Sequence, residues 1–189
     1  MLEDEQELVK RAKGGEAEAF GLLYDYYLPK IYRFVLLKVS HREEAEDLTH
    51  QTFLKAWQNI DQYDFRGHSF GSWLYRIARN AVIDYHRKGR ISPAFSLDDF
   101  ELELPGQERS PEELLESRLE TETILEAIRE LKEIEQEVLL MRFVEELNTK
   151  EVAEIVKKTE GAVKLIQHRA LKSLAKLLDE KNNGGNKTN

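Results

Sequence analysis

Apolar residues recur every three or four positions along most of the chain, and no alternation of apolar and polar residues persists. This spacing gathers apolar side chains on one side of a helix and predicts helices rather than strands. The expected helices cover residues 5–13, 17–38, 42–59, 71–88, 111–131, 134–144, 149–156 and 160–178. The sequence therefore predicts an all-α fold.

Proline and glycine divide this helical pattern into two parts. Three of the four prolines lie between residues 93 and 111, with Gly89 and Gly106 nearby, which is typical of a linker. We expect two small helical domains joined by an acidic flexible linker, the second domain containing a helix-turn-helix near its end. The expected ranges are 1–90 for the first domain, 91–110 for the linker, 111–180 for the second domain and 181–189 for a disordered polar tail.

The charge of the chain is unevenly distributed. The net charge of −8, from 28 Lys and Arg against 36 Asp and Glu, argues by itself against a nucleic-acid partner. Residues 98–122 hold ten acids and two bases, however, whereas residues 66–90 and 157–176 each hold six bases and one acid. The acidic excess therefore lies in one segment, and the basic stretches on either side of it are candidates for binding DNA.

Composition also indicates the compartment. The chain has no cysteine, which excludes disulfides and thiolate chemistry and suits a reducing cytoplasm. No apolar run approaches the roughly 20 residues that span a bilayer. The acidic start, Met1-Leu2-Glu3, is unlike a secretory signal. We expect a cytoplasmic protein with no membrane insertion.

The helix expected at 71–88 has two different sides. Its core side is apolar and holds Trp73, Leu74, Ile77, Ala78, Ala81 and Tyr85. Its other side is mostly basic, with Tyr75 at the flank, and holds Arg76, Arg79, Asn80, Ile83, His86 and Arg87. Arginine suits phosphates and asparagine suits base edges, so this side is either a DNA-binding face or a solvated helix surface.

Residues 63–71 precede this helix and combine aromatic residues with two glycines. They show no helical period. Such a loop can hold a base taken out of the DNA stack, or its aromatic side chains can close the core instead.

The helix expected at 42–59 also has two sides. The core side holds Ala45, Leu48, Thr52, Phe53, Ala56 and Ile60. The far side holds Asp47, His50, Gln51, Leu54 and Gln58, with Trp57 at the boundary. Leu54 and Trp57 among polar groups indicate either a partner-binding surface or ordinary exposed apolar residues.

Residues 149–171 fit a helix-turn-helix, in which the second helix enters the major groove of DNA. The expected core side of that second helix holds Val163, Ile166, Ala170, Leu171 and Leu174. Its outward side holds Lys164, Leu165, His168, Arg169, Lys172 and Lys176. The alternative is a helical hairpin with a solvated basic end.

Taken together, several ordered motifs resemble one known family. They are Glu46-Asp47-Leu48-Thr49-His50-Gln51-Thr52-Phe53-Leu54-Lys55-Ala56-Trp57, Phe65-Arg66-Gly67, Trp73-Leu74-Tyr75-Arg76-Ile77-Ala78-Arg79-Asn80, Val138-Leu139-Leu140-Met141-Arg142-Phe143, Glu160-Gly161-Ala162-Val163-Lys164 and His168-Arg169-Ala170-Leu171. In this order and spacing, from about Phe20 to Leu178, they resemble bacterial alternative sigma factors of the extracytoplasmic-function type. The resemblance implies a transcription initiation factor that directs core RNA polymerase to promoters.

The resemblance also implies partners and site residues. The partners would be core RNA polymerase, through the clamp helices and flap of its large subunits, promoter DNA, and an anti-sigma factor. Polymerase binding would fall on Asp47, His50, Gln51, Leu54 and Trp57. Reading and melting of the minus-ten element would fall on Asp64, Phe65, Arg66, Gly67, Arg76, Arg79, Asn80, Ile83 and Arg87. Reading of the minus-thirty-five element would fall on Lys158, Glu160, Gly161, Lys164, Leu165, His168, Arg169 and Lys172.

Two departures from the family pattern fall on the expected contact surfaces. His50-Gln51 stands where the family usually has Gln-Glu, so one carboxylate is missing from the polymerase contact. Residues 164–168 lack a common arginine, and Leu165 faces outward, where it suits a thymine methyl group or a partner protein.

Other classes of function explain less of the sequence. A helix-turn-helix regulator that acts on duplex DNA without joining polymerase would use residues 149–171 alone, and a protein-only adaptor would need no DNA. A metal enzyme is disfavoured because the five histidines are scattered without metal-binding spacing. We expect no enzyme activity, no cofactor, and no catalytic, cofactor-binding or metal-binding residues.

Overall fold

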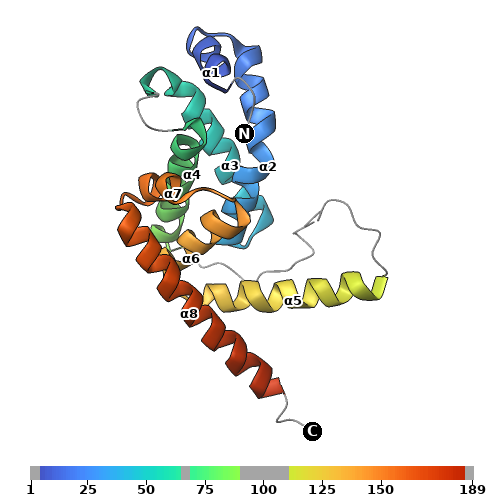
Figure 1. The fold of residues 1–189 in the computed structure, drawn as a ribbon. Helices are drawn as coiled ribbons and strands as arrows, with labels where there is room; N and C mark the ends of the chain where they lie inside the picture. The colour runs from blue at the N-terminus through green and yellow to red at the C-terminus, as the bar shows by residue number, and fades with distance from the viewer. Residues whose placement is uncertain (1–4, 65–68, 90–110, 186–189) are drawn as a thin grey trace. The chain divides into compact units, whose positions relative to one another are not determined.

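The computed structural model describes residues 5–64, 69–89 and 111–185. These residues form helices and no strand, which confirms the all-α prediction (Figure 1). The helices are α1 (Glu5–Lys13), α2 (Ala17–Val39), α3 (Arg42–Gln58), η1 (Ile60–Gln62), α4 (Phe70–Arg87), α5 (Pro111–Arg129), α6 (Glu133–Leu139), η3 (Leu140–Val144), α7 (Thr149–Val156) and α8 (Glu160–Gly185).

Two helices differ from the sequence prediction by more than one or two residues at an end. The single helix expected at 134–144 is divided into α6 and the π-helical turn η3. Helix α8 continues to Gly185, so the first residues assigned to a disordered tail are helical. The ammonium of Lys181 lies 3.1 Å from the carboxylates of both Glu126 and Glu130 on α5, which ties this last part of α8 to its neighbour.

The described helices divide into two compact units. One contains α1 to α4 with η1 and also α7, and the other contains α5, α6, η3 and α8. Helix α7, which lies within the range 111–180 expected for the second domain, packs against α4 in the first of these two units. The expected linker, 91–110, lies outside the described residues.

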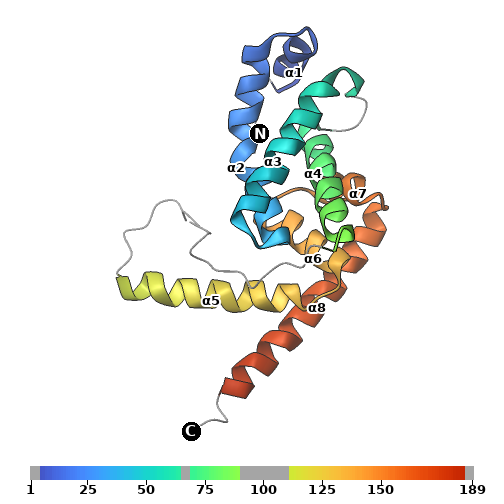
Figure 2. The same cartoon turned by 180° about the vertical axis from the view of Figure 1, so that it is seen from behind.

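Helix α2 packs against α1, α3 and α4 in the first unit (Figures 1 and 2). Phe34 of α2 meets Tyr75 of α4 edge-on, with ring centroids 5.5 Å apart. Tyr75 is one of the largest fully buried side chains. Tyr75 was expected at the flank of the basic face but belongs to the core, while Trp73 and Ile77, expected in the core, are half-buried.

Helix α4 begins with a capped turn. The Ser69 hydroxyl accepts a hydrogen bond from the Ser72 N–H at 3.1 Å, which satisfies one of the unpaired donors of a helix start. Ser69 also donates to the Glu151 carboxylate of α7 at 3.2 Å. Glu151 in turn accepts from the Asn148 N–H at 2.8 Å, so one carboxylate serves the starts of both α7 and α4.

The second unit has a smaller core. Helix α8 packs against α5 and α6 and buries Val163 and Ala170. Gln136 of α6 donates to the Arg129 and Leu131 carbonyls at 2.9 Å each, which fixes the turn between α5 and α6. Leu171 was expected in this core but is 41% exposed, because the buried side of α8 passes through Val163 and Ala170 instead.

Two glycines provide a test of packing around α2. A Cβ added at Gly71 in α4 would lie 3.0 Å from the Tyr27 hydroxyl, whereas one at Gly21 in α2 would meet nothing within 4 Å. The Tyr27 ring packs against Phe70 at 5.7 Å and Tyr26 at 4.9 Å, which restricts its movement away from position 71.

We therefore expect Gly71→Ala to lower the free energy of unfolding by about 1 kcal/mol through overpacking. Gly21→Ala, the matched control, should raise it by about 0.5–1 kcal/mol through helix propensity. Thermal unfolding followed by circular dichroism measures both. Equal stabilisation by the two substitutions would contradict the tight packing of α4 on Tyr27.

Candidate polymerase and DNA interfaces

Helix α3 has the two sides that its sequence predicts. All six expected core residues are buried, and Thr52 donates to the Leu48 carbonyl at 2.7 Å instead of leaving its hydroxyl unpaired. The opposite side is exposed along the length of the helix and holds Asp47, His50, Gln51 and Leu54. Because the core fixes the helix, these exposed side chains are presented on a rigid element.

Two exposed apolar side chains stand out on α3. Leu54 is 56% exposed and Trp57 is 36% exposed. The Trp57 ring lies 4.8 Å from the Phe20 ring of α2, which limits its rotation and leaves part of the indole accessible. Leu22 of α2 is also 52% exposed, and the sequence analysis missed it. The adjacent leucines Leu22 and Leu23 could have indicated this, because neighbouring residues of a helix point in different directions, and only Leu23 is buried.

The basic side of α4 is partly accessible. Asn80 and Arg87 are exposed, while Arg76, Arg79 and Ile83 are half-buried. Arg87 lies 3.1 Å from the Asp84 carboxylate, an exposed pair that contributes little stability. His86 was placed on this face, but its ring Nε2 lies 3.2 Å from the Lys38 carbonyl, so it faces the end of α2 instead.

The aromatic residues before α4 divide between core and loop. Tyr63 is 2% exposed, and its ring lies 5.6 Å from Phe70 and 5.3 Å from Trp73. Of the two roles expected for the aromatic residues of this segment, Tyr63 and Phe70 therefore have the structural one, in which their rings close the core. Asp64 is exposed, whereas Phe65, Arg66 and Gly67 lie outside the described residues.

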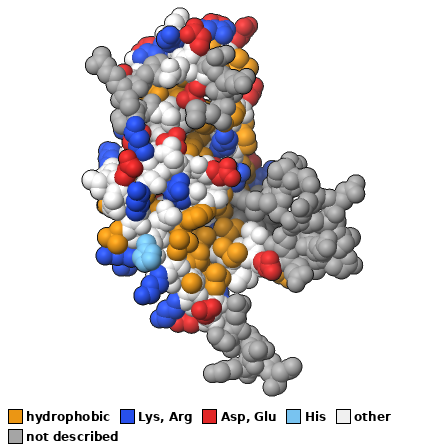
Figure 3. Space-filling view, in the orientation of Figure 1, with side chains coloured by type: hydrophobic (Ala, Val, Ile, Leu, Met, Phe, Trp, Pro, Cys, Tyr) orange, Lys and Arg blue, Asp and Glu red, His pale blue; other side chains and the backbone are white. Residues whose placement is uncertain are grey.

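The residues predicted on the outward side of α8 are exposed in the structure. Lys164, Leu165, His168, Arg169, Lys172 and Lys176 are all exposed, and Figure 3 shows Lys and Arg side chains gathered along this helix. Leu165 is 49% exposed among them. Gln167 points elsewhere, because its side chain accepts from the Arg142 guanidinium at 3.3 Å. Lys158, Glu160 and Gly161, at and before the start of α8, are also exposed.

Two features are absent from the described part of the chain. No group of three or more His, Asp or Glu residues there lies close enough together to hold a metal ion. Likewise, none of the helices described has both the length and the apolar character needed to cross a membrane.

Comparison with known proteins places this arrangement in a family. Residues 23–91 match Sigma-70 region 2, and residues 127–176 match Sigma-70 region 4. The chain is 40% identical over 174 residues to the ECF RNA polymerase sigma factor BldN of Streptomyces coelicolor, covering 92% of this chain and 66% of that protein. It is 32% identical over 182 residues to the ECF RNA polymerase sigma factor SigW of Bacillus subtilis, covering 90% of this chain and 94% of SigW.

A solved structure shares the fold. The sigma factor RpoE of Bartonella quintana, in complex with the anti-sigma factor NepR, superposes with a TM-score of 0.66 and 24% identity over 85% of this chain and 96% of that one. The chain belongs to the extracytoplasmic-function sigma factors of RNA polymerase. It is a transcription initiation factor that directs core RNA polymerase to promoter DNA.

Proposed function

We propose that three exposed helix faces divide the work of initiation in this chain. The exposed side of α3 binds the polymerase clamp helices, the basic side of α4 with the loop before it opens the minus-ten element, and the outward side of α8 reads the minus-thirty-five element. The observation that carries the proposal is the two-sidedness of α3 and α8. Residues in the family's contact positions are exposed, while the opposite sides of the same helices build the core.

On α3 the proposed contact is an apolar centre with a polar rim. Leu54 and Trp57 supply the apolar area, and Asp47, His50 and Gln51 supply the rim. Tryptophan and desolvated apolar groups carry much of the energy of protein interfaces, while rim groups set orientation. The His50-Gln51 departure removes a carboxylate from that rim, so this contact rests more on Leu54 and Trp57.

At the minus-ten element the loop residues and α4 have different tasks. Phe65 stacks on a base taken out of the duplex, with Asp64, Arg66 and Gly67 beside it. Arg76, Arg79, Asn80, Ile83 and Arg87 then hold the separated strand. Unstacking a base costs a few kcal/mol, which the contacts of polymerase and both domains together must supply. The free protein therefore binds duplex DNA weakly.

On α8 the exposed residues divide by chemistry. Lys158, Arg169 and Lys172 suit phosphates, which position the helix without reading sequence. Lys164, Leu165 and His168 suit base edges, with Leu165 on a thymine methyl group. Glu160 and Gly161 at the helix start complete this surface. The domain ranges remain as proposed: 1–90 and 111–180 with an acidic linker, 91–110.

Membership of the sigma factor family also supports proposals about how this protein is regulated and where it acts. RpoE was solved with an anti-sigma factor, and we propose a partner of this class for the present chain. We also propose that the protein acts in the cytoplasm, where promoters are, as a factor without enzyme activity of its own.

The overall test is transcription in vitro with core polymerase on a library of random promoter sequences, followed by sequencing of the start sites. A defined pair of promoter elements should emerge only when the protein is present. The rival regulator that works without polymerase predicts instead tight, sequence-specific binding of the free protein to duplex DNA.

Leu54→Asp should weaken polymerase binding about thirtyfold, because it puts a charge at the apolar centre of the contact. The fold should be unaffected, since Leu54 is 56% exposed. Lys55→Asp, an exposed neighbour outside the proposed contact, is the matched control. Binding of labelled protein to core polymerase measures the affinity, and an unchanged affinity for Leu54→Asp would rule out the proposed docking.

Leu165→Ala should relax base preference at one position of the minus-thirty-five element, because the contact to a thymine methyl group is lost. Lys172→Ala should instead weaken all promoters to a similar degree and reduce the salt dependence of binding. Start-site sequencing from the promoter library distinguishes the two patterns. An unchanged preference in Leu165→Ala would show that this side chain does not read DNA.

A further inference from the structure

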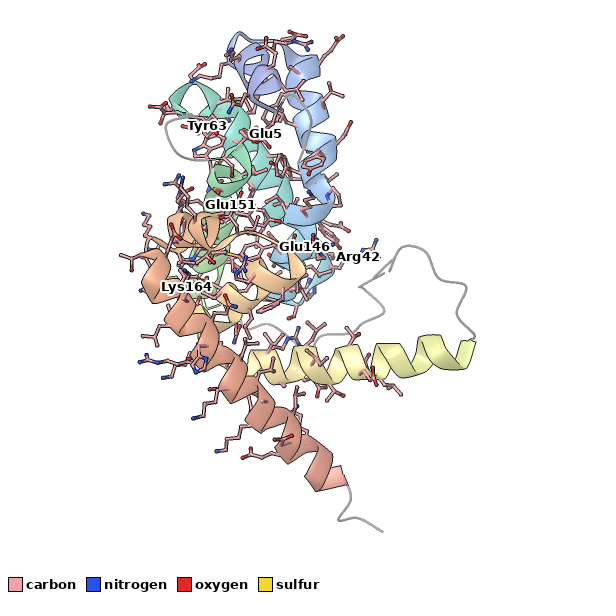
Figure 4. The ribbon with its side chains drawn as sticks, in the orientation of Figure 1. Glu5, Arg42, Tyr63, Glu146, Glu151 and Lys164 are labelled. Carbon is pink, nitrogen blue, oxygen red and sulfur yellow. The ribbon has the colours of Figure 1, made fainter. Side chains whose placement is uncertain are left out.

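Helix α1 contacts the first turn of α4 by two routes. One route is direct, because the Glu5 carboxylate accepts a hydrogen bond from the Phe70 backbone N–H at 3.3 Å. The other passes through Tyr63, whose carbonyl accepts from the Lys13 ammonium at 2.6 Å. The Tyr63 ring in turn lies 5.6 Å from Phe70 and 5.3 Å from Trp73 of α4. Figure 4 labels Glu5 and Tyr63, which lie near the start of α4.

Glu5 also reaches α2. Its carboxylate accepts a hydrogen bond from the Tyr27 hydroxyl, and the Tyr27 ring lies 5.7 Å from Phe70. Burial, and then the charge of Glu5, raise the pKa of Tyr27, which therefore stays protonated as a donor. The N–H groups at a helix start are unpaired within the helix and carry partial positive charge, so a carboxylate is favourable there. Glu5 thus fixes α1, α2 and the start of α4 to one another.

These contacts are distinct from the packing that holds α1 in place. The core side of α1 is apolar and consists of Leu8, Val9 and Ala12, all of which are buried. Another charged pair on the same helix, Lys10 with Glu7 at 3.4 Å, faces water, with side chains 68% and 60% exposed. Lys13 and Glu5 are half-buried and instead bind backbone groups of residues far along the chain. Substituting these two residues therefore leaves the core side of α1 intact.

The first turn of α4 sets the direction of its basic side. Arg76 and Asn80 lie six and ten residues beyond Phe70 in the same helix. At about 1.5 Å per residue, they are about 9 and 15 Å further along the helix axis. A change in the direction of α4 at its first turn therefore moves these two side chains by more than it moves the turn itself.

We propose that α1 positions α4 for the separated minus-ten strand, with Glu5 and Lys13 as its two positioning residues. This inference rests on the proposed role of the basic side of α4. Affinity falls with the fraction of molecules whose binding surface has the orientation that the ligand needs. Two bonds that hold α4 in one orientation therefore raise its affinity for the strand, although Glu5 and Lys13 touch neither DNA nor polymerase in this role.

The test measures binding to a strand that is already unpaired, so that melting of the duplex does not enter the measurement. Each variant is assembled with core polymerase and titrated with a labelled single-stranded oligonucleotide that carries the minus-ten sequence selected from the promoter library. The affinity of each variant for polymerase is measured separately. Lys13→Met and Glu5→Ala are compared with Lys10→Met and Glu7→Ala, the same changes at the water-facing pair.

Lys13→Met and Glu5→Ala should each weaken strand binding about tenfold, the fold-change that corresponds to losing one hydrogen bond to a charged group. Polymerase affinity, and strand binding by the two controls, should stay within about twofold of the unaltered protein. Lys13→Arg, which keeps a charged donor, and Glu5→Gln, which keeps an acceptor, should recover most of the strand affinity. A merely structural defect would lower polymerase affinity as well, so the ratio of the two affinities isolates positioning.

A double-mutant cycle shows whether α1 acts through α4. In a protein that carries both Arg76→Ala and Asn80→Ala, the side chains that α1 is proposed to position are already missing. Lys13→Met should therefore weaken strand binding less than about threefold in this background, because the effects of coupled residues are not additive. The full loss in this background would show that Lys13 acts elsewhere and would overturn the inference.

The outcomes separate this inference from the function beneath it. If the protein with Arg76→Ala and Asn80→Ala binds the strand as tightly as the unaltered protein, the proposed role of α4 is wrong, and the inference fails with it. If that protein is impaired while Lys13→Met binds the strand as tightly as Lys10→Met, only the role of α1 is overturned. Should Glu5→Ala fail to fold, Lys13→Met with its Lys13→Arg rescue still decides the matter.

Discussion

The Glu5 carboxylate joins the start of α4 to two other helices of the first unit. Glu5 accepts from the Tyr27 hydroxyl and from the Phe70 N–H, and so joins α1, α2 and α4 at a single point. A charged group in such a partly buried place is tolerated only when it is hydrogen-bonded. The same point favours glycine at position 71, because a Cβ there would lie only 3.0 Å from the Tyr27 hydroxyl. The direction in which α4 leaves the core, and therefore the direction of its basic side, follows from this arrangement.

Each of the helices proposed to bind polymerase or DNA uses its two sides for different purposes. The buried side of α3 fixes the helix through residues such as Phe53 and Ala56, which leaves Leu54 exposed one position away. On α8, Val163 and Ala170 are buried while Leu165 lies outside. The core holds each of these helices rigid but leaves one apolar residue exposed. A partner can bind that residue without the free-energy cost of ordering the backbone.

Helical periodicity predicted the local structure well and long-range contacts poorly. The bounds of α1 and α7 and the core side of α3 follow from apolar spacing alone. Periodicity did not separate Tyr75 from the basic side of α4, because it lies at the edge of the apolar arc. The bonds from Lys13 to Tyr63 and from Glu5 to Phe70 join residues 50 and 65 positions apart, which no local pattern encodes. The packing of α7 against α4 was missed for the same reason.

The net charge of −8 is a poor guide to what this protein binds. At physiological ionic strength, charges separated by more than about 8 Å are largely screened from each other. Helix α8, with 26 residues, is several times longer than this distance, at about 1.5 Å per residue. A phosphate near its outward side therefore responds first to the charged groups on that side, among them Lys164, Arg169 and Lys172. An acidic protein can thus bind DNA where the exposed side of one helix is predominantly basic.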